Sequence, residues 1–354
     1  MKIFDLLKKD YYESYEFDIY FVLFFFISIG FGALSLLINS TFVVVICLLL
    51  ALLIMLPVLL YVLYQHQTYS LDISYLRLKL QKGKTAAVQI LGNKLLTQNI
   101  GHESKKIRMI FLSDLHLNKY FNKKFLNSLI GRVNSLGADV LLFGGDYIID
   151  YRTNVAVLDA MKGFKAKTKI AVLGNHDYSI RSQRKFRNES SHELYFKKGK
   201  EVENKLRLLG MKVLRNENYL MNFPQQLEIN FFGLDSDWAN IAKPEKFNPA
   251  EHNIVISHEP TEFESWNFKN TDLVLTGHNH GGQLRLSKSI GHLTKAKFLP
   301  SRIRRNIKED YGDYSEGLYK NKYGLRMYLS RGIGTVLTAL RINAKPEMVV
   351  IDVE

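Results

Sequence analysis

The chain has 354 residues, of which 47% are hydrophobic, enough for one large domain and a smaller appendage. Its formal net charge is +14 and its pI is about 9.5. This balance suits a phosphate substrate, an anionic lipid surface or a nucleic acid, although a basic surface without a specific partner would give the same numbers. The single cysteine, Cys47, excludes an intrachain disulfide, so composition gives no sign of an oxidising compartment.

A long uncharged stretch dominates the N-terminal part of the chain. No Asp, Glu, Lys or Arg occurs from Ile19 to Leu71. The polar residues 39–41 divide it into segments 19–38 and 42–64, and each has about the 20 residues that a helix needs to cross a bilayer. We therefore predict that residues 1–74 form a membrane anchor with a transmembrane helical hairpin, the alternative being a buried soluble hairpin.

Cations flank the predicted hairpin on both sides. Lysines precede it, and Arg77, Lys79 and Lys82 follow it with no acid between these three cations. The positive-inside rule places both ends in the cytoplasm. We therefore expect localisation at the inner (cytoplasmic) membrane, with the large domain facing the cytoplasm.

A repeated pattern begins at residue 107. Residues 75–106 before it are basic, show no clear period, and are interpreted as a connector. From residue 107 to residue 354, short apolar runs of strand length each end in a potential metal ligand; the runs are 107–112, 140–143, 170–173, 254–256 and 273–275. Helical patterns lie at 122–137 and 155–163. This alternation predicts an α/β fold whose buried strands bring their carboxyl ends to one edge of a sheet.

The polar residues that follow the five runs predict a metal centre. In chain order they are Asp114, His116, Asp146, Asn175, His176, Asp177, His258, His278 and His280. Oxygen and nitrogen donors without a thiolate suit Mn, Fe or Zn. Because more than four donors converge, two divalent ions are expected. Two ions about 3.5–4 Å apart can clamp a phosphate and activate a water.

These blocks resemble the calcineurin-like metallophosphoesterases, whose motifs Asp-x-His, Gly-Asp, Gly-Asn-His-Asp, His and Gly-His-x-His occur here in the same order. The resemblance covers residues 107–354 and implies a four-layer sandwich of two mixed sheets flanked by helices. It also implies a position for each donor. One ion would be bound by Asp114, His116 and His280. The other would be bound by Asn175, His258 and His278, with Asp146 as the bridge.

The resemblance further implies catalytic roles. His176 would approach the leaving oxygen or a phosphate oxygen, and Asp177 would be its partner. The family often has a second Asp three residues after the bridging one, whereas Asp150 lies four residues after Asp146. Only the local loop geometry depends on this difference.

The tail of the chain, residues 329–347, resembles the bacterial membrane-associated branch of the family. That branch includes enzymes that cleave UDP-2,3-diacylglucosamine in lipid A synthesis. We therefore expect a membrane-anchored phosphoesterase that uses metal-activated water on a phosphodiester or pyrophosphate bond of an amphiphilic substrate. Two alternatives remain. One is an inactive membrane-attached scaffold, and the other is a nuclease, although no interleaved aromatic pattern supports nucleic-acid binding.

A basic segment follows the last block of donors. Residues 285–308 contain no acid and interleave cations with apolar residues. This pattern suits a segment that holds anionic head groups near the membrane or the mouth of the site, and equally suits a solvated loop. The substrate-binding candidates are Arg285 in this segment, together with Asn175 and His176.

Overall fold

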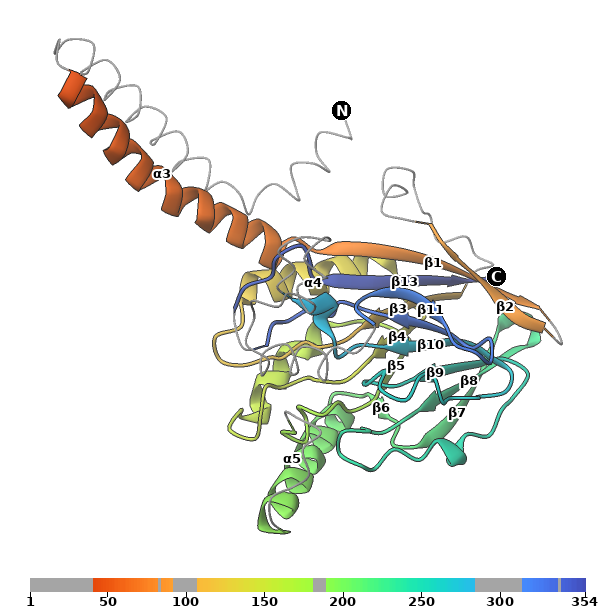
Figure 1. Cartoon of the computed structure of the whole chain (residues 1–354). Coiled ribbons are helices and arrows are strands. Elements are labelled where there is room, and N and C mark those ends of the chain that lie inside the picture. The colour runs from red at the N-terminus through yellow and green to blue at the C-terminus, as the bar shows by residue number, and fades with distance from the viewer. Residues whose placement is uncertain (1–40, 82–83, 92–106, 181–188, 284–313, 337–338) are drawn as a thin grey trace. The chain divides into compact units, whose positions relative to one another are not determined.

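The computed structural model describes residues 41–81, 84–91, 107–180, 189–283, 314–336 and 339–354 (Figure 1). The chain divides into two compact units between His66 and Gln67. Helix α3, Thr41–Tyr69, crosses this boundary. Its residues up to His66 are the described part of the first unit, and its last three residues belong to the second unit.

Helix α3 has 29 residues and contains the second predicted span, residues 42–64. Many of its leucines are exposed, for example Leu49 at 60% and Leu53 at 69%. No helix in the described ranges is long and apolar enough to cross a membrane. The first predicted span, residues 19–38, lies outside these ranges. The transmembrane hairpin is not confirmed and stays a prediction.

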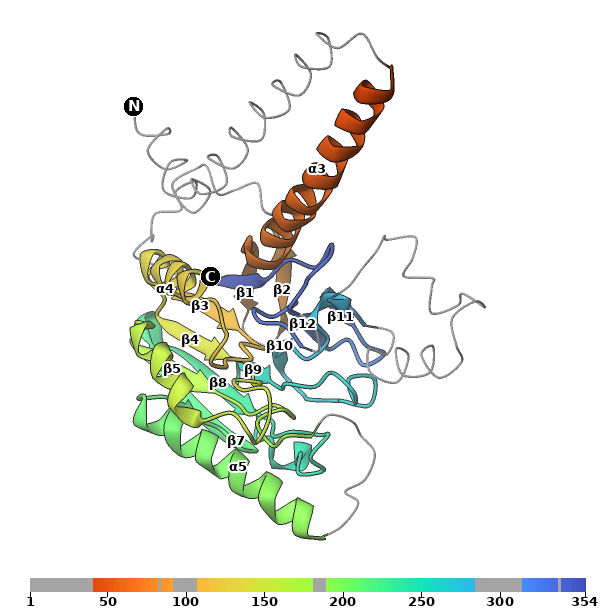
Figure 2. The same ribbon diagram turned by 90° about the vertical axis from the view of Figure 1, so that its left-hand side faces the viewer.

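Two mixed sheets form the second unit, as the resemblance implied (Figure 1, Figure 2). The seven-stranded sheet has the order β2 (Lys84–Ile90), β1 (Asp72–Gln81), β13 (Glu347–Val353), β3 (Ile107–Leu112), β4 (Val140–Phe143), β5 (Thr168–Ala171) and β6 (Lys212–Val213). The six-stranded sheet has the order β11 (Gly317–Lys320), β12 (Arg326–Leu329), β10 (Thr271–Thr276), β9 (Asn253–Ile256), β8 (Leu227–Gly233) and β7 (Glu217–Phe223). Strands β3 to β6 are parallel, and so are β8, β9, β10 and β12.

The two sheets pack face to face through alternate side chains of their strands. On β3, Met109 and Phe111 join a core with Leu273 of the second sheet, whereas Ile110 and Leu112 join a core with the helices. All five are fully buried. Burial of each such side chain contributes about 1.5–3 kcal/mol. This packing brings the carboxyl ends of strands from both sheets together.

Helices cover the outer face of the seven-stranded sheet (Figure 2). Helix α4, Lys123–Leu136, confirms the first predicted helix. Its cap Asn122 accepts the N–H of Phe125 at 3.1 Å, and Gly137 ends it with φ 65°. The second predicted helix is the 3-10 helix η2, Val155–Gly163, instead of an α-helix. Helix α5, Glu189–Leu208, was not predicted.

Loops cover the outer face of the six-stranded sheet in the part of the chain that the structure describes. Phe263, Trp266 and Phe268, between β9 and β10, pack on Val255 and Val274. The 3-10 helices η3 (Pro224–Gln226) and η4 (Pro244–Lys246) are short turns. Among the described residues, the predicted flanking by helices therefore holds for one sheet. In the described part of the chain, clustered aromatic side chains rather than a helix cover the outer face of the second sheet.

The segment predicted as a connector begins with a β-hairpin. Strands β1 and β2 form one edge of the seven-stranded sheet, and β1 pairs in parallel with β13, Asp72 opposite Glu347. The domain boundary predicted at residue 74 therefore falls inside β1. Buried and more exposed positions alternate along part of β1, and the cations Arg77 and Lys79 stand on the more exposed side. Because of these cations, β1 was not predicted as a strand from the sequence.

Candidate metal centre

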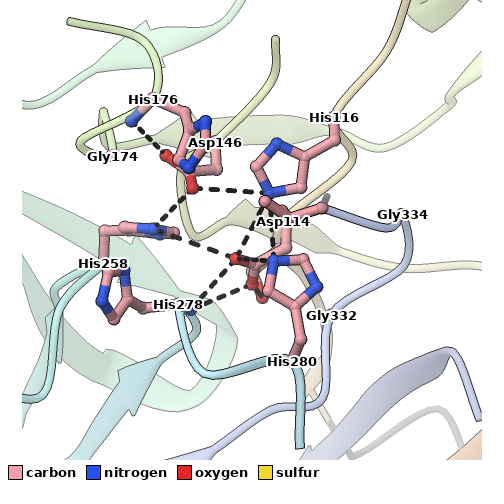
Figure 3. Close-up of polar contacts among 12 residues, drawn as sticks. Asp114, His116, Asp146, Gly174, His176, His258, His278, His280, Gly332 and Gly334 are labelled. Carbon is pink, nitrogen blue, oxygen red and sulfur yellow. Dashed lines mark hydrogen bonds and ion pairs between the residues drawn. The ribbon is translucent and has the colours of Figure 1, made fainter. Parts of the chain in front are cut away.

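The predicted donors meet where strands of both sheets end (Figure 3). Asp114 and His116 follow β3, Asp146 follows β4, and Asn175 follows β5, all in the seven-stranded sheet. His258 follows β9, and His278 and His280 follow β10. Both strands belong to the six-stranded sheet. The prediction of a single sheet edge was wrong. The site lies between two sheets because their parallel strands point the same way across the shared core.

Tight backbone turns aim these side chains inward. Five of the donors have a left-handed backbone conformation: Asp114 (φ 55°), His116 (φ 45°), Asp146 (φ 57°), His278 (φ 78°) and His280 (φ 50°). Each such conformation costs a residue other than glycine about 1–3 kcal/mol. Strain of this kind clusters at functional sites, where the surrounding fold holds it in place.

The first group of donors consists of Asp114, His116 and His280, all buried. The Nε2 atoms of His116 and His280 lie 3.0 Å apart, and His280 Nε2 lies 3.4 Å from Oδ1 of Asp114. Nδ1 of His116 lies 3.3 Å from the carbonyl oxygen of Ile148. A proton on that Nδ1 leaves the Nε2 lone pair to face the centre, as a metal ligand requires.

The second group consists of Asp146, His258 and His278. Oδ2 of Asp146 lies 3.0 Å from Nε2 of His258 and 3.5 Å from Nε2 of His116, so this carboxylate faces both groups. Asn175 belongs here too, because its Oδ1 lies 3.0 Å from Nδ1 of His278. The two groups and their shared carboxylate correspond to the predicted pair of ions and bridge.

The protonation of the histidines fits this assignment. Burial lowers the pKa of His116 to about 3 and that of His278 to about 3, so both are neutral at pH 7. Burial also opposes a charge on His258, but Asp146 and Asp114 raise its pKa well above the ordinary value. Nε2 of His258 faces Oδ2 of Asp146 at 3.0 Å, while its Nδ1 lies 2.7 Å from the carbonyl oxygen of Gly144. A divalent ion beside Asp146 would take the place of the His258 proton.

His176 lies beside both groups. One of its ring nitrogens is within 4.8 Å of the donor atoms of His116 and Asp146. Its Nδ1 lies 2.6 Å from the carbonyl oxygen of Ile149, and its backbone N–H donates to Oδ1 of Asp146 at 2.8 Å. The ring is therefore held against the centre by Ile149, without help from a carboxylate.

Asp177 has a different role from the one predicted. Its buried carboxylate accepts the backbone N–H groups of Gly174, Asp146 and Tyr147 at 3.0, 3.0 and 2.9 Å. Ile149, rather than Asp177, is the partner of the His176 ring, so that part of the prediction is corrected. Burial and the charge of Asp146 raise the pKa of Asp177 to about 8. Asp177 fastens the loops after β4 and β5 to each other.

Two residues near the centre had no predicted role, and Arg285 lies outside the described residues. Arg341 is fully buried, and its Nη2 lies 3.2 Å from Nδ1 of His280. Trp238 packs against the ring of His278, with centroids 4.4 Å apart. Arg341 lies in the tail that resembles the family, but no sequence pattern around it indicated a contact with a metal donor. The loop that carries Trp238 has no motif at all.

Gly332 leaves room for Asp114, and we expect Gly332→Ala to damage the centre. A Cβ at Gly332 would lie 2.5 Å from Cβ of Asp114, and the residue has φ 64°. The substitution should lower the free energy of unfolding by at least about 2 kcal/mol and weaken Mn²⁺ binding. Chemical denaturation of the metal-free protein and Mn²⁺ titration measure both effects.

Gly131→Ala is the matched control for this substitution. Gly131 lies inside α4, and a Cβ there would meet nothing within 4 Å. This variant should be as stable as the parent or more stable by up to about 1 kcal/mol. Equal unfolding free energies and equal Mn²⁺ affinities in the two alanine variants would show that Gly332 is not needed to make room for Asp114.

Comparison with known proteins shows which protein family the second unit resembles. Residues 107–282 match the profile of the calcineurin-like phosphoesterase family. This part of the chain is a calcineurin-like metallophosphoesterase domain, and the protein is a hydrolase. The family uses a dinuclear divalent metal centre, and the two donor groups around Asp146 fit such a centre.

Named relatives come from several bacteria. The chain is 28% identical over 250 residues to phosphodiesterase YaeI of Escherichia coli (strain K12), covering 69% of this chain and 81% of the relative. It is 25% identical over 267 residues to UDP-2,3-diacylglucosamine pyrophosphatase LpxG of Chlamydia muridarum, covering 64% and 78%. Among solved structures, a dimetal phosphatase from Danio rerio has a TM-score of 0.33 and 12% identity, covering 64% of this chain and 88% of that one.

Proposed function

We propose that the protein is a membrane-anchored, dinuclear metal-dependent phosphoesterase that hydrolyses a phosphodiester or pyrophosphate bond in an amphiphilic substrate. The observation that carries the chemistry is the pair of donor groups that share Asp146. All of the predicted donors are present, whereas an inactive scaffold on the same fold has no need to keep them. UDP-2,3-diacylglucosamine is the specific substrate we propose, because two relatives carry that activity in their names.

The residues of the chain have separate tasks in this reaction. Two bound divalent ions would polarise the phosphoryl group and lower the pKa of the attacking water. Asp146 holds the two donor groups at a fixed separation through its contacts with His116 and His258. His176 is fixed by Ile149 beside this carboxylate, where its ring can give a proton to the leaving oxygen.

Membrane attachment is supported by the sequence and by α3. The uncharged stretch from Ile19 to Leu71 is long enough for two spans, and α3 exposes leucines along its length. The cations around the stretch favour a cytoplasmic domain at the inner membrane. Carbonate extraction of membranes, followed by protease treatment of inverted vesicles, tests this. Release of the protein by carbonate, or protection of the domain in inverted vesicles, would contradict the proposal.

We expect the full chain in detergent to hydrolyse bis-p-nitrophenyl phosphate with Mn²⁺ and to lose this activity with a chelator. With UDP-2,3-diacylglucosamine, mass spectrometry should find UMP and the diacylglucosamine phosphate. Hydrolysis of the model compound alone would reject the lipid nucleotide, and cleavage of single-stranded DNA or RNA instead would favour the nuclease. Two bound ions without any hydrolysis would favour the scaffold.

A further inference from the structure

The loop that follows the donor His116 exposes cations beside an aromatic ring. We call residues Asn118–Lys124, which comprise the turn before α4 and the first two residues of that helix, the 118–124 loop. Lys119, Lys123 and Lys124 are exposed, and Tyr120 is 81% exposed. Nζ of Lys119 lies 4.7 Å from the centroid of the Tyr120 ring. These side chains form a basic, amphipathic surface next to the metal centre.

The 118–124 loop is held in an ordered conformation. Leu117 before it is buried, and its backbone N–H donates to the carbonyl oxygen of Tyr147 at 2.7 Å. Oδ1 of Asn118 accepts the N–H of Tyr120 at 2.8 Å, and Nδ2 of Asn118 donates to the carbonyl oxygen of His116 at 3.1 Å. Tyr120 is therefore presented to the outside by a built turn, which leaves its ring uncovered.

The charge of this surface has a single sign. The sequence from Leu117 to Leu136 contains no Asp or Glu. Among the residues that the structure describes, no carboxylate forms an ion pair with Lys123 or Lys124, although both are exposed. Lysine stems and a tyrosine ring can lie at the head-group level of a bilayer while their polar ends stay in water. The chemistry fits an anionic lipid surface.

The position of the 118–124 loop in the fold also fits contact with an anionic lipid surface. Tyr69, the last residue of α3, packs against Phe125 with ring centroids 5.6 Å apart, and Phe121 of the loop packs against the same ring at 6.3 Å. Tyr69 follows Tyr64, the end of the predicted span, by five residues in the sequence. The loop therefore packs, through Phe125, against a residue that lies close in the sequence to the end of that span.

We propose that the 118–124 loop docks on the surface of an anionic phospholipid bilayer, with Tyr120 among the head groups and the three lysines near the phosphates. This inference rests on the proposed membrane attachment. It adds an orientation to that proposal, because the loop begins two residues after His116. Docking brings the side of the metal centre that holds His116 toward the lipid surface, where an amphiphilic substrate presents its phosphate.

The chain offers a matched control at the opposite end of the sheets. Tyr323 is 51% exposed and Nζ of Lys322 lies 5.0 Å from its ring, so the pair has the same chemistry as Lys119 and Tyr120. It lies in the turn that leads into β12, which runs parallel to β10. The metal centre follows the carboxyl end of β10. Tyr323 is therefore remote from the centre and from the 118–124 loop.

The test uses the full chain in nanodiscs that contain brominated phosphatidylcholine with or without phosphatidylglycerol. In Tyr120→Trp, fluorescence from the new tryptophan, after subtraction of the parent signal, should be quenched at least twofold in anionic nanodiscs. In Tyr323→Trp the corresponding signal should be unchanged. Equal quenching of the two tryptophans would overturn the inference. A chain that does not enter nanodiscs would instead reject the proposed anchoring.

Charge variants give a second, independent readout. On the Tyr120→Trp background, the triple variant Lys119→Gln, Lys123→Gln and Lys124→Gln should abolish the anionic-lipid dependence of the quenching while bis-p-nitrophenyl phosphate turnover is kept. Loss of three lysines near an anionic surface corresponds to about a 100-fold weaker surface association. The control Lys322→Gln should leave the quenching unchanged. Persistence of anionic-lipid dependence in the triple variant would overturn the role of these cations.

Discussion

Asp146→Asn should lower turnover of bis-p-nitrophenyl phosphate by at least about 1,000-fold while the protein keeps its fold. Oδ2 of Asp146 lies 3.5 Å from Nε2 of His116 and 3.0 Å from Nε2 of His258, so it faces both donor groups, whereas Asp114 comes no nearer than 3.9 Å to Nε2 of His258. An amide has the same shape but lacks the second anionic oxygen needed to bridge two cations. Its oxygen can still accept the N–H of His176, which now donates to Oδ1.

The measurement compares turnover, bound Mn²⁺ and thermal unfolding of this variant with those of Asp150→Asn. Asp150 lies four residues further along the same loop, but its carboxylate accepts hydrogen bonds from Arg152, through Oδ2 at 2.6 and 3.1 Å. Asp150→Asn should keep both ions and most of the turnover. Undiminished turnover in Asp146→Asn would remove Asp146 from the mechanism. Equal losses in both variants would point to damage of the loop instead.

The donors could be predicted from the sequence because each follows an apolar run that is short enough to be a buried strand. The runs 107–112 and 140–143 coincide with β3 and β4, and α4 with its two cap residues spans the predicted helical pattern 122–137. These features depend on neighbours in the chain, so local patterns suffice. The motif order then supplied what periodicity alone did not, namely a second sheet and the assignment of donors to two ions.

Contacts between distant segments could not be predicted. Sheet order is set by packing over long separations, so β1 beside β13 left no local sign in residues 75–106. The acceptor of the His176 ring proton is a backbone carbonyl, Ile149, which any residue type could provide. Asp177 follows His176 directly and therefore looked like its partner, although its carboxylate turns toward backbone N–H groups of two loops.

Arg341 is the clearest such long-range contact, and we expect Arg341→Lys to weaken one ion and spare the other. The guanidinium is fully buried and donates to the carbonyl oxygens of Gly334, Ala344 and Arg331 at 3.1, 2.8 and 2.9 Å. Burial lowers the pKa of Arg341 to about 9, which still leaves it charged at pH 7. Within the described residues no carboxylate is hydrogen-bonded to it. The carbonyl dipoles, together with the charges of Asp114 and Glu347 at longer range, offset the cost of burying the charge.

The location of Arg341 explains why only one ion should suffer. Its Nη1 donates to the backbone carbonyl oxygen of His280 at 3.4 Å, and its Nη2 lies 3.2 Å from Nδ1 of the ring, on the side away from the centre. It also holds the loop whose Gly334 N–H donates to the carbonyl oxygen of Asp114 at 2.7 Å. Asp114 and His280 both belong to the first donor group. Lysine keeps the charge but offers no planar set of donors, so His280 and this loop lose their support.

Affinity for the ion at the first donor group should fall about 10- to 100-fold, the usual effect of removing a residue that orients a metal ligand. Titration with Mn²⁺ followed by electron paramagnetic resonance should show the spectrum of coupled ions in the parent, and mainly that of single ions in Arg341→Lys at the same concentration. Arg108→Lys is the control for lost stability, because Arg108 is also buried but pairs with Asp352 at 2.8 Å, away from the centre. Arg108→Lys should unfold more easily yet keep the coupled spectrum. If Arg341→Lys also kept it at parental Mn²⁺ concentrations, Arg341 would be a residue that stabilises the fold without positioning His280.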